Sequence, residues 1–358
     1  MSRRSNPSAN SESEIRPAKG PVSLKALAAY LGLSPTTLSL VLNGSALANT
    51  IPQETKDRIF EAARKFDYRP NFIARSLRSA RTYTLGVLVP ELSDGYSAMV
   101  LSGVEDQLLK EGYFYFVASH RHRADLIERY PRMLLDRCVE GLIAVDTPVP
   151  REPHYPVVTV SGHHDFKGLT NVLLDHRQAA KLALEYLVSL GHRQIAVIKG
   201  QEFSSDTRVR WEAIREESER LGLSITPPLV AQLEGDLPSP ETGFVAARKL
   251  LSAGRQFTAL FAFNDVSAIG AIRAFQEAGY RVPDEISVIG FDNIYSAEFH
   301  NPALTTIGQP LREMGRQAAE YLLKRIAEGP DAAVPEEVVL EPQLIIRQST
   351  AIAGKIES

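Results

Sequence analysis

Cysteine is almost absent from this chain, which has one such residue, Cys138, in 358 positions. A single cysteine excludes an internal disulfide, so the fold has to be held by other interactions. Cys138 stands in an apolar run before Gly141, and we expect a small buried side chain there without chemistry of its own.

Long apolar runs are also missing. No window of eighteen or more apolar residues occurs, and the first twenty residues are polar without an apolar centre. We therefore expect neither a membrane span nor a secretory signal, and we expect the protein to stay in the cytoplasm. The length and the ordinary share of hydrophobic and charged residues predict two or three globular domains.

Enzyme signatures are missing as well. The chain has no G-x-S-x-G, Walker loop, G-x-G-x-x-G or H-E-x-x-H, so we predict no enzyme and no cofactor. Two histidine pairs, His120 with His122 and His163 with His164, lack cysteines and carboxylates at ligand spacing. We expect exposed loop histidines rather than a metal site, with His163 and His164 as candidates for the border of a cleft.

The charge is unevenly distributed. Residues 1–82 carry 13 Lys and Arg against 6 Asp and Glu, whereas the remainder carries 27 against 37. A basic segment on an acidic body is typical of a nucleic-acid binder whose second part does not bind nucleic acid. A charged solubilising arm is the alternative.

Residues 22–43 have the pattern of two short helices joined by a tight turn. Ser23 can cap the first helix, Gly32 supplies the turn, and Ser34 caps the second helix with Pro35 at its first position. The second helix presents short polar side chains such as Thr36, which fit a major groove. An ordinary helix pair is the alternative.

This segment resembles the lactose-repressor (LacI/GalR) family of bacterial transcription regulators. The match follows A-x-x-x-G-x-S-x-x-T-x-S-x-V-x-N from Ala28 to Asn43, and it resumes at Y-R-P-N before Ala74 and Leu77. Segments such as GHRQIAVIKG and VPDEISVIGFDN extend the resemblance over nearly all of the chain. The resemblance implies a DNA-binding repressor that acts as a homodimer and is controlled by a small effector. The DNA-binding residues that it implies are Ser23, Ser34, Pro35, Thr36, Thr37, Ser39, Leu40, Asn43, Asn71, Ala74, Arg75, Leu77 and Arg78.

Two of these positions have particular implications. Many family members carry arginine where this chain has Leu40, and leucine favours contact with a thymine methyl group over a bidentate contact with guanine. Packing of Leu40 within the headpiece is the alternative. By the resemblance, Leu77 is the hinge residue that opens a base step in the minor groove, and a charged linker helix is the alternative.

The remaining pattern predicts the domains. We expect a disordered arm over 1–20, a helix-turn-helix domain over 21–70 and a hinge helix with linker over 71–83. A third helix from Pro52 to about Phe66 should close the headpiece with an apolar stripe of Ile59, Phe60, Ala63 and Phe66. From Thr84, short apolar strands alternate with amphipathic helices, which predicts doubly wound parallel sheets in an α/β core over 84–350. By the resemblance this core is two-lobed and periplasmic-binding-protein-like, with lobe 1 near 84–170 and 308–330 and lobe 2 near 171–304 and 335–350.

Ligands of such open sheets bind at the carboxyl ends of strands, here between the lobes. The resemblance places an effector on Arg210, Asn264 and Asp292, and arginine, asparagine and aspartate suit the hydroxyl groups of a sugar. Helix capping is an equally good interpretation of Asn264. The effector-binding residues that we expect are Asp94, Tyr96, Ser161, Arg210, Asn264 and Asp292.

The resulting hypothesis is a repressor of palindromic operators with a sugar-like effector. The alternative is a non-DNA solute-binding protein, or an enzyme on the same two-lobed fold. A solute-binding protein needs an export signal and no basic headpiece, and an enzyme needs a catalytic constellation. The sequence has neither.

Overall fold

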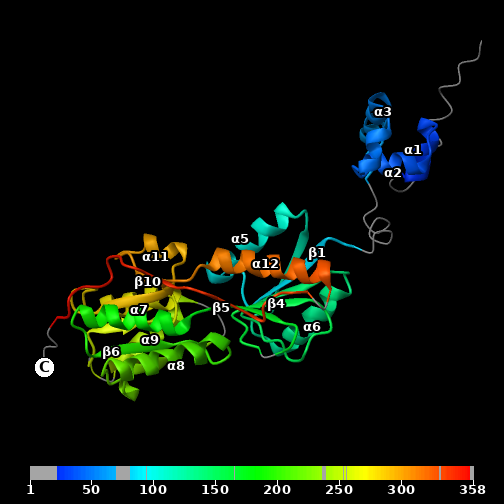
Figure 1. Cartoon of the computed structure of the whole chain (residues 1–358). Coiled ribbons are helices and arrows are strands. Elements are labelled where there is room, and N and C mark those ends of the chain that lie inside the picture. The colour runs from blue at the N-terminus through cyan, green and yellow to red at the C-terminus, as the bar shows by residue number, and fades with distance from the viewer. Residues whose placement is uncertain are drawn as a thin grey trace, which may run out of the picture. The chain divides into compact units, whose positions relative to one another are not determined.

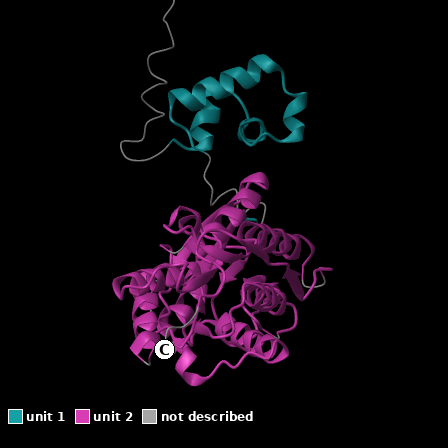
Figure 2. Cartoon of the chain, turned by 90° about the vertical axis from the view of Figure 1, so that its left-hand side faces the viewer, with its two compact units in different colours: residues 1–82 teal, residues 83–358 magenta. Residues whose placement is uncertain are grey.

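The computed structural model describes residues 22–69, 81–93, 95–164, 166–235, 239–252, 254, 256–329 and 332–354. The chain forms two compact units, 1–82 and 83–358 (Figure 2). The expected arm over 1–20, nearly all of the hinge and the site residue Asp94 lie outside the described residues.

The first unit contains the expected helical headpiece. Ser23 caps α1 by accepting a hydrogen bond from the Ala26 N–H, and Gly32 ends it with φ 68°, a left-handed conformation that glycine adopts without strain. Ser34 caps α2 in the same way through the Thr37 N–H. The helical elements of the first unit are α1 (Leu24–Leu31), α2 (Pro35–Leu42), the 3-10 turn η1 (Ala46–Thr50) and α3 (Gln53–Lys65).

A single apolar cluster holds the headpiece helices together. Leu27 of α1, Leu38 of α2 and Ile59 of α3 are fully buried at its centre. The predicted stripe is wrong at Phe60, which is 44% exposed, because Ala62 faces the cluster instead.

The second unit begins with a six-stranded sheet in the order β11-β5-β4-β3-β1-β2, with every pair parallel. We call this sheet with its helices lobe 1 (Figure 1). All six residues of β1 are buried, as expected for a strand covered on both faces. The strands of lobe 1 are β1 (Thr84–Val89), β2 (Phe114–Ser119), β3 (Leu142–Val145), β4 (Val157–Val160), β5 (Thr170–Leu174) and β11 (Glu337–Leu340), and its helices are α5 (Gly95–Lys110), α6 (Ala124–Leu135) and α12 (Leu311–Glu328).

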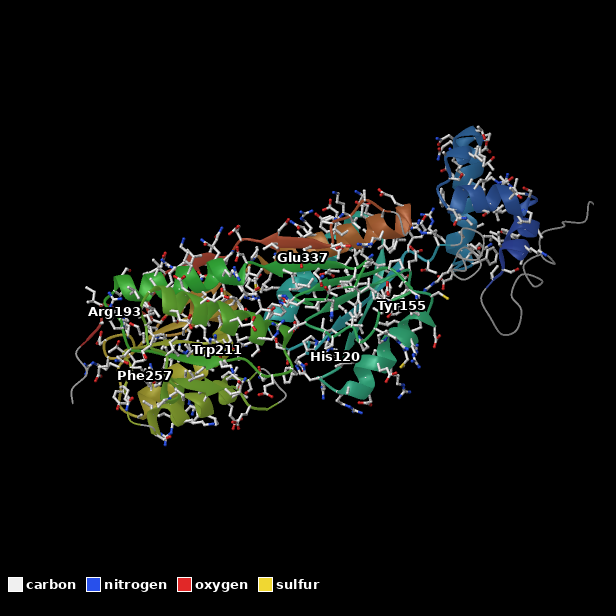
Figure 3. The ribbon with its side chains drawn as sticks, turned by 60° about the horizontal axis from the view of Figure 1, so that its bottom comes forward. His120, Tyr155, Arg193, Trp211, Phe257 and Glu337 are labelled. Atoms are coloured by element: carbon white, nitrogen blue, oxygen red, sulfur yellow. The ribbon has the colours of Figure 1, made fainter. Side chains whose placement is uncertain are left out.

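A second sheet, in the order β12-β10-β9-β8-β6-β7, forms lobe 2 and is parallel except for β12. Figure 3 shows Phe257 and Trp211 in this lobe and Tyr155 in lobe 1. The strands of lobe 2 are β6 (Ile195–Lys199), β7 (Val230–Gln232), β8 (Ala259–Phe261), β9 (Ser287–Asp292), β10 (Thr305–Gly308) and β12 (Gln343–Ile345), and its helices are α7 (His176–Ser189), α8 (Ser205–Arg220), η2 (Pro227–Leu229), α9 (Pro240–Ser252), α10 (Asp265–Glu277) and α11 (Tyr295–Phe299).

In each lobe, glycines allow one pair of helices to pack with their backbones close together. A side chain at Gly103 of α5 would collide with the backbone of Arg312 in α12, and one at Gly270 of α10 would collide with Pro240 in α9. These helix pairs cover the sheets and complete the apolar cores.

The expected fold class is confirmed, but sheet membership differs from the expected lobe limits. Strand β5, expected in lobe 2, pairs with β4 of lobe 1, and β11, also expected in lobe 2, pairs with β5. The prediction for Cys138 is also wrong, because this residue is exposed at φ 60° in the turn after α6.

Among the described residues, no single helix is long and apolar enough to cross a membrane. Helices α1 and α2, bent by 108° from each other, pass such a test only as a pair, on length and composition. This is weak support for a span, since buried core helices pass the same test.

Candidate functional site: a cavity between the two lobes

The carboxyl ends of strands from both lobes surround a cavity of about 70 Å³. Asp146 follows β3 of lobe 1, and Asp292 ends β9 of lobe 2. Both have positive φ, 38° and 107°, as the chain turns sharply at the end of each strand. The cavity therefore lies where open parallel sheets usually bind ligands.

Four of the six expected effector residues line this cavity: Tyr96, Arg210, Asn264 and Asp292. Ser161 is buried behind them and accepts a hydrogen bond of 2.9 Å from the Tyr96 hydroxyl. Asp94 lies outside the described residues.

Arg210 projects from α8 and is buried. Its guanidinium carbon lies 4.3 Å from the ring centroid of Phe263 and 3.6 Å from that of Phe291. Nη1 donates to the Phe263 carbonyl and Nη2 to Oδ2 of Asp206 at 3.4 Å, whereas Nε has no hydrogen-bond partner among the described residues. Burial lowers the pKa of Arg210, and the nearby carboxylates of Asp206 and Asp292 oppose that shift.

Asp206, one turn before Arg210, is the centre of a polar network. Its Oδ1 lies 2.7 Å from Nε2 of His163 and 3.2 Å from Nε2 of His176. Burial would raise the pKa of Asp206, but interactions with His176, His163 and Arg210 outweigh burial and hold that pKa well below its usual value. Burial is the largest influence on His176 and lowers its pKa, which favours the neutral imidazole.

The same three side chains, His163, His176 and Asp206, place one potential metal-ligating atom each within 4.8 Å of one another. A ligating histidine almost always donates its second ring N–H to an acceptor. Nδ1 of His176 is buried without a partner in the described part of the chain, so the group fits a His–Asp hydrogen-bond network better than a metal centre.

The beginning of α8 and the residues before it connect lobe 2 with lobe 1. The Ser204 hydroxyl donates to Oδ1 of Asp146 at 3.3 Å, and the Ser205 hydroxyl donates to the Ser161 carbonyl at 2.5 Å. The ring of Phe203 stacks on His122 of lobe 1 at 3.7 Å between centroids. Together with the His163–Asp206 contact, these interactions fasten the lobes beside the cavity.

Asn264 and Gln309 complete the lobe 2 wall. Asn264 accepts a hydrogen bond from the Ser267 N–H and forms a capping box at α10, so its capping role is confirmed while it also lines the cavity. Gln309 donates from Nε2 to Oδ1 of Asp292 at 2.7 Å, and its buried Oε1 has no partner among the described residues.

The expectation of exposed histidines is wrong at all four positions. His120 is fully buried and lies 2.9 Å from the Thr147 hydroxyl, and burial lowers its pKa to about 4. His122, His163 and His164 are half-buried, and His164 accepts a hydrogen bond from the Val149 N–H. These histidines therefore stabilise the packing within lobe 1 and its contact with lobe 2.

Sequence reasoning missed several cavity residues. Asp146 ends an apolar strand run, and Asp206 lies four residues before Arg210 on one helix face, so both left a readable signal. His122 and Phe203 left none, because their contact joins segments 81 positions apart. The cavity residues that were missed are Pro90, His122, Asp146, Gln201, Phe203, Ser204, Asp206, Phe263 and Gln309.

The headpiece presents a second candidate surface along α2. Ser34, Pro35, Thr36 and Asn43 are exposed, and Thr37, Ser39 and Leu40 are half-buried. Leu40 packs against the headpiece cluster, and its contact with a thymine methyl group stays a prediction. Asn71, Ala74, Arg75, Leu77 and Arg78 lie outside the described residues.

A small helical headpiece and a two-lobed core with a cavity between its lobes define a ligand-controlled DNA-binding protein. The pattern described as "Bacterial regulatory proteins, lacI family" matches residues 23–71, and the pattern described as "Periplasmic binding protein-like domain" matches residues 184–350. The chain is 32% identical over 337 residues to the HTH-type transcriptional repressor PurR of Pasteurella multocida (strain Pm70), covering 91% of this chain and 98% of that protein. The PurR repressor of Haemophilus influenzae (strain ATCC 51907 / DSM 11121 / KW20 / Rd) matches with the same identity and coverage.

Solved structures agree with this result. The lac repressor dimer bound to operator and the anti-inducer ONPF has a TM-score of 0.81 and 27% identity, covering 93% of this chain and 100% of that one. The complex of the regulator CelR with cellobiose has a TM-score of 0.66 and 26% identity, covering 91% and 99%. The chain belongs to the LacI family of bacterial regulatory proteins. It is an effector-controlled, DNA-binding transcription regulator and not an enzyme.

Proposed function

We propose that this regulator is a homodimeric repressor that acts in the cytoplasm and releases or binds its operator in response to a sugar-like effector held between the lobes. The headpiece and hinge, within residues 21–83, provide the DNA contacts, and the core over 84–350 provides the effector site and the dimer contact. The exposed polar face of α2, with Thr36 and Asn43, supports the assignment of the DNA surface.

The observation that carries the effector proposal is the composition of the cavity wall. Arg210 is held between two phenylalanine rings with its Nε directed to no protein group among the described residues, and Asp292 lies on the same wall. An arginine and a carboxylate together offer paired donors and acceptors to adjacent hydroxyl groups. CelR has been solved with cellobiose, and a LacI family regulator from Enterococcus faecium, 29% identical with a TM-score of 0.65, has been solved with bound ribose.

A thermal-shift screen of the purified full-length protein against sugars, sugar phosphates and nucleobases would identify the ligand, because a ligand that binds the native state raises its apparent stability. Calorimetry would then compare the wild type with Arg210→Ala and with Arg215→Ala, which removes an exposed arginine from the same helix. A lost hydrogen bond to a charged group is worth about 1.5–3 kcal/mol, so Arg210→Ala should weaken binding by roughly tenfold or more while Arg215→Ala should not. Equal affinities for the wild type and Arg210→Ala would remove this residue from the site.

A further inference from the structure

The cavity between the lobes is small. Its volume of about 70 Å³ holds roughly five to seven water molecules, which occupy on the order of 150–200 Å³ in the liquid. One sugar ring with its hydroxyl groups occupies a similar volume, and two linked rings need about twice as much. With the lobes fastened as they are in this structure, the space therefore matches a single sugar ring.

Phe203 lies where this cavity meets solvent. It is 38% exposed, whereas the other described residues that line the cavity are buried or half-buried. The ring of Phe203 belongs to lobe 2 and stacks on the ring of His122 from lobe 1, with 3.7 Å between the centroids and 28° between the planes. Both residues line the cavity, so the stack closes it from one lobe to the other at its solvent side.

Hydrogen bonds hold the backbone near each of these two rings. On lobe 1, the His122 N–H donates to Nδ1 of the fully buried His120 at 3.1 Å. On lobe 2, the hydroxyl group of Ser204, the residue after Phe203, donates to Oδ1 of Asp146 in lobe 1 at 3.3 Å. A ligand that is larger than the cavity therefore fits only if the rings separate, and the loss of their contact weakens its binding.

We propose that the stack of Phe203 on His122 limits the size of the effector, so that the ligand is a monosaccharide and disaccharides are rejected. This inference rests on the proposed sugar-like effector and narrows its class. Binding sites achieve specificity by rejection of a competitor as well as by attraction of the correct ligand. Here the groups that attract the sugar lie inside the cavity, and the stacked rings reject a second sugar ring at its solvent side.

The first test compares sugars of two sizes by calorimetry on the wild-type full-length protein. Glucose is paired with cellobiose and maltose, xylose with xylobiose, and galactose with galactobiose. At least one monosaccharide should bind roughly tenfold or more tightly than its disaccharides. A disaccharide that binds as tightly as its monosaccharide overturns the inference, and if Arg210→Ala weakens that disaccharide the proposed function still stands. If no sugar of either size binds, both fail.

The second test asks whether the stack causes this preference. Phe203→Ala removes one ring and His122→Ala removes the other, so each variant should improve disaccharide binding relative to the monosaccharide and reduce the preference several-fold. Phe203→Tyr keeps a ring that can stack and should keep the preference. Because the two alanine variants break the same contact, their combination should change the preference little more than either one alone.

Phe116→Ala is the matched control, because Phe116 is also 38% exposed but belongs to β2 and is not among the described residues that line the cavity. It should leave the preference unchanged. A melting curve of each variant shows whether it is folded, and if one alanine variant of the stack is not, the other decides. A preference that survives intact in the folded alanine variants overturns the inference. An equal loss of preference in Phe116→Ala shows a general loosening of the core and also overturns it.

Discussion

The two units of this protein differ in where their charged side chains lie, exposed in the headpiece and partly buried in the core. In the described headpiece residues, 22–69, no polar or charged side chain is buried. The core buries many, among them Asp206, Arg210 and Asp265, and burial raises the pKa of Asp265 to about 7. Exposed charges attract phosphate groups over a distance and depend on salt, whereas buried charges in fixed positions select one ligand.

The apolar core of the headpiece is also smaller than the apolar cores of the two lobes. The headpiece relies on one cluster around Leu27, Leu38 and Ile59, while each lobe has a sheet with apolar clusters on its faces. Small units bury a smaller fraction of their surface and are only marginally stable. The DNA-binding unit should therefore be the fragile one, and the core should tolerate losses that the headpiece cannot.

The largest expected effect comes from Leu27→Ala. Truncation of a fully buried leucine costs about 2–5 kcal/mol, which is comparable to the whole stability expected for so small a unit. The headpiece should unfold and operator binding should be lost, while ligand binding by the core persists. Fluorescence anisotropy with operator DNA and calorimetry of the two unfolding transitions would measure both effects.

Leu184→Ala is the matched change in α7 of the core, since Leu184 is also a fully buried helical leucine. It should lower the melting temperature of the core without unfolding it and leave the headpiece transition in place. If Leu27→Ala binds operator as the wild type does, the contrast in stability between the units is wrong.

Much of this architecture was readable from local patterns. Caps at Ser23 and Ser34 and the turn at Gly32 were predicted correctly because they depend on neighbours within four residues. The expected stripe in α3 failed at Phe60, because Ala62 also fits the helical period and only packing decides between them. Lobe membership of β5 and β11 failed because strand pairing joins distant segments.

In the candidate site, too, some residues could be predicted from the sequence and others could not. The resemblance located Arg210, Asn264 and Asp292 on the cavity wall. The network of Asp206 with His163 and His176 was not predicted, because its contacts join distant segments: His176 lies on another helix of lobe 2, and His163 belongs to lobe 1. The burial of His120 was missed for a similar reason, since its partner Thr147 follows a different strand.

A second, smaller effect is expected in the core on acidification. His120, labelled in Figure 3, accepts a hydrogen bond at Nδ1 from the His122 N–H, so a proton on Nδ1 would displace that contact. Burial lowers the pKa of His120 from 6.5 to about 4. In that interval the unfolded chain takes up a proton that the folded chain does not. The free energy of unfolding is therefore unaffected by His120 above pH 6.5 and falls by on the order of 3 kcal/mol as the pH decreases to about 4.

The melting temperature of the core measured against pH would show this loss. His120→Gln cannot titrate and should make the curve less steep between pH 6.5 and about 4, while His176 and His192, whose pKa values burial also lowers, account for the slope that remains. His154→Gln replaces an exposed histidine and should not. A wild-type slope in His120→Gln would show that another group causes the acid sensitivity.

The smallest effect, Ser34→Ala, tests whether the fragility of the headpiece extends to a single hydroxyl group. The Ser34 hydroxyl accepts from the Thr37 N–H at 3.1 Å and lies 2.9 Å from the Thr37 hydroxyl, so it fixes the first turn of α2. Its loss should cost about 1 kcal/mol, and Ser34→Asn should restore most of that stability because asparagine is also a good cap. Ser34 is also an expected DNA contact, and the Asn variant separates the two roles. Recovered headpiece stability with weak operator binding would show a direct contact, and full recovery of both would show that Ser34 acts only as a cap.

Asp175→Ala removes the corresponding cap of α7 in the core. The core of this variant should still be almost fully folded at the temperature where the headpiece of Ser34→Ala is already unfolded. Equal losses of melting temperature in the two units would end the contrast on which these predictions rest.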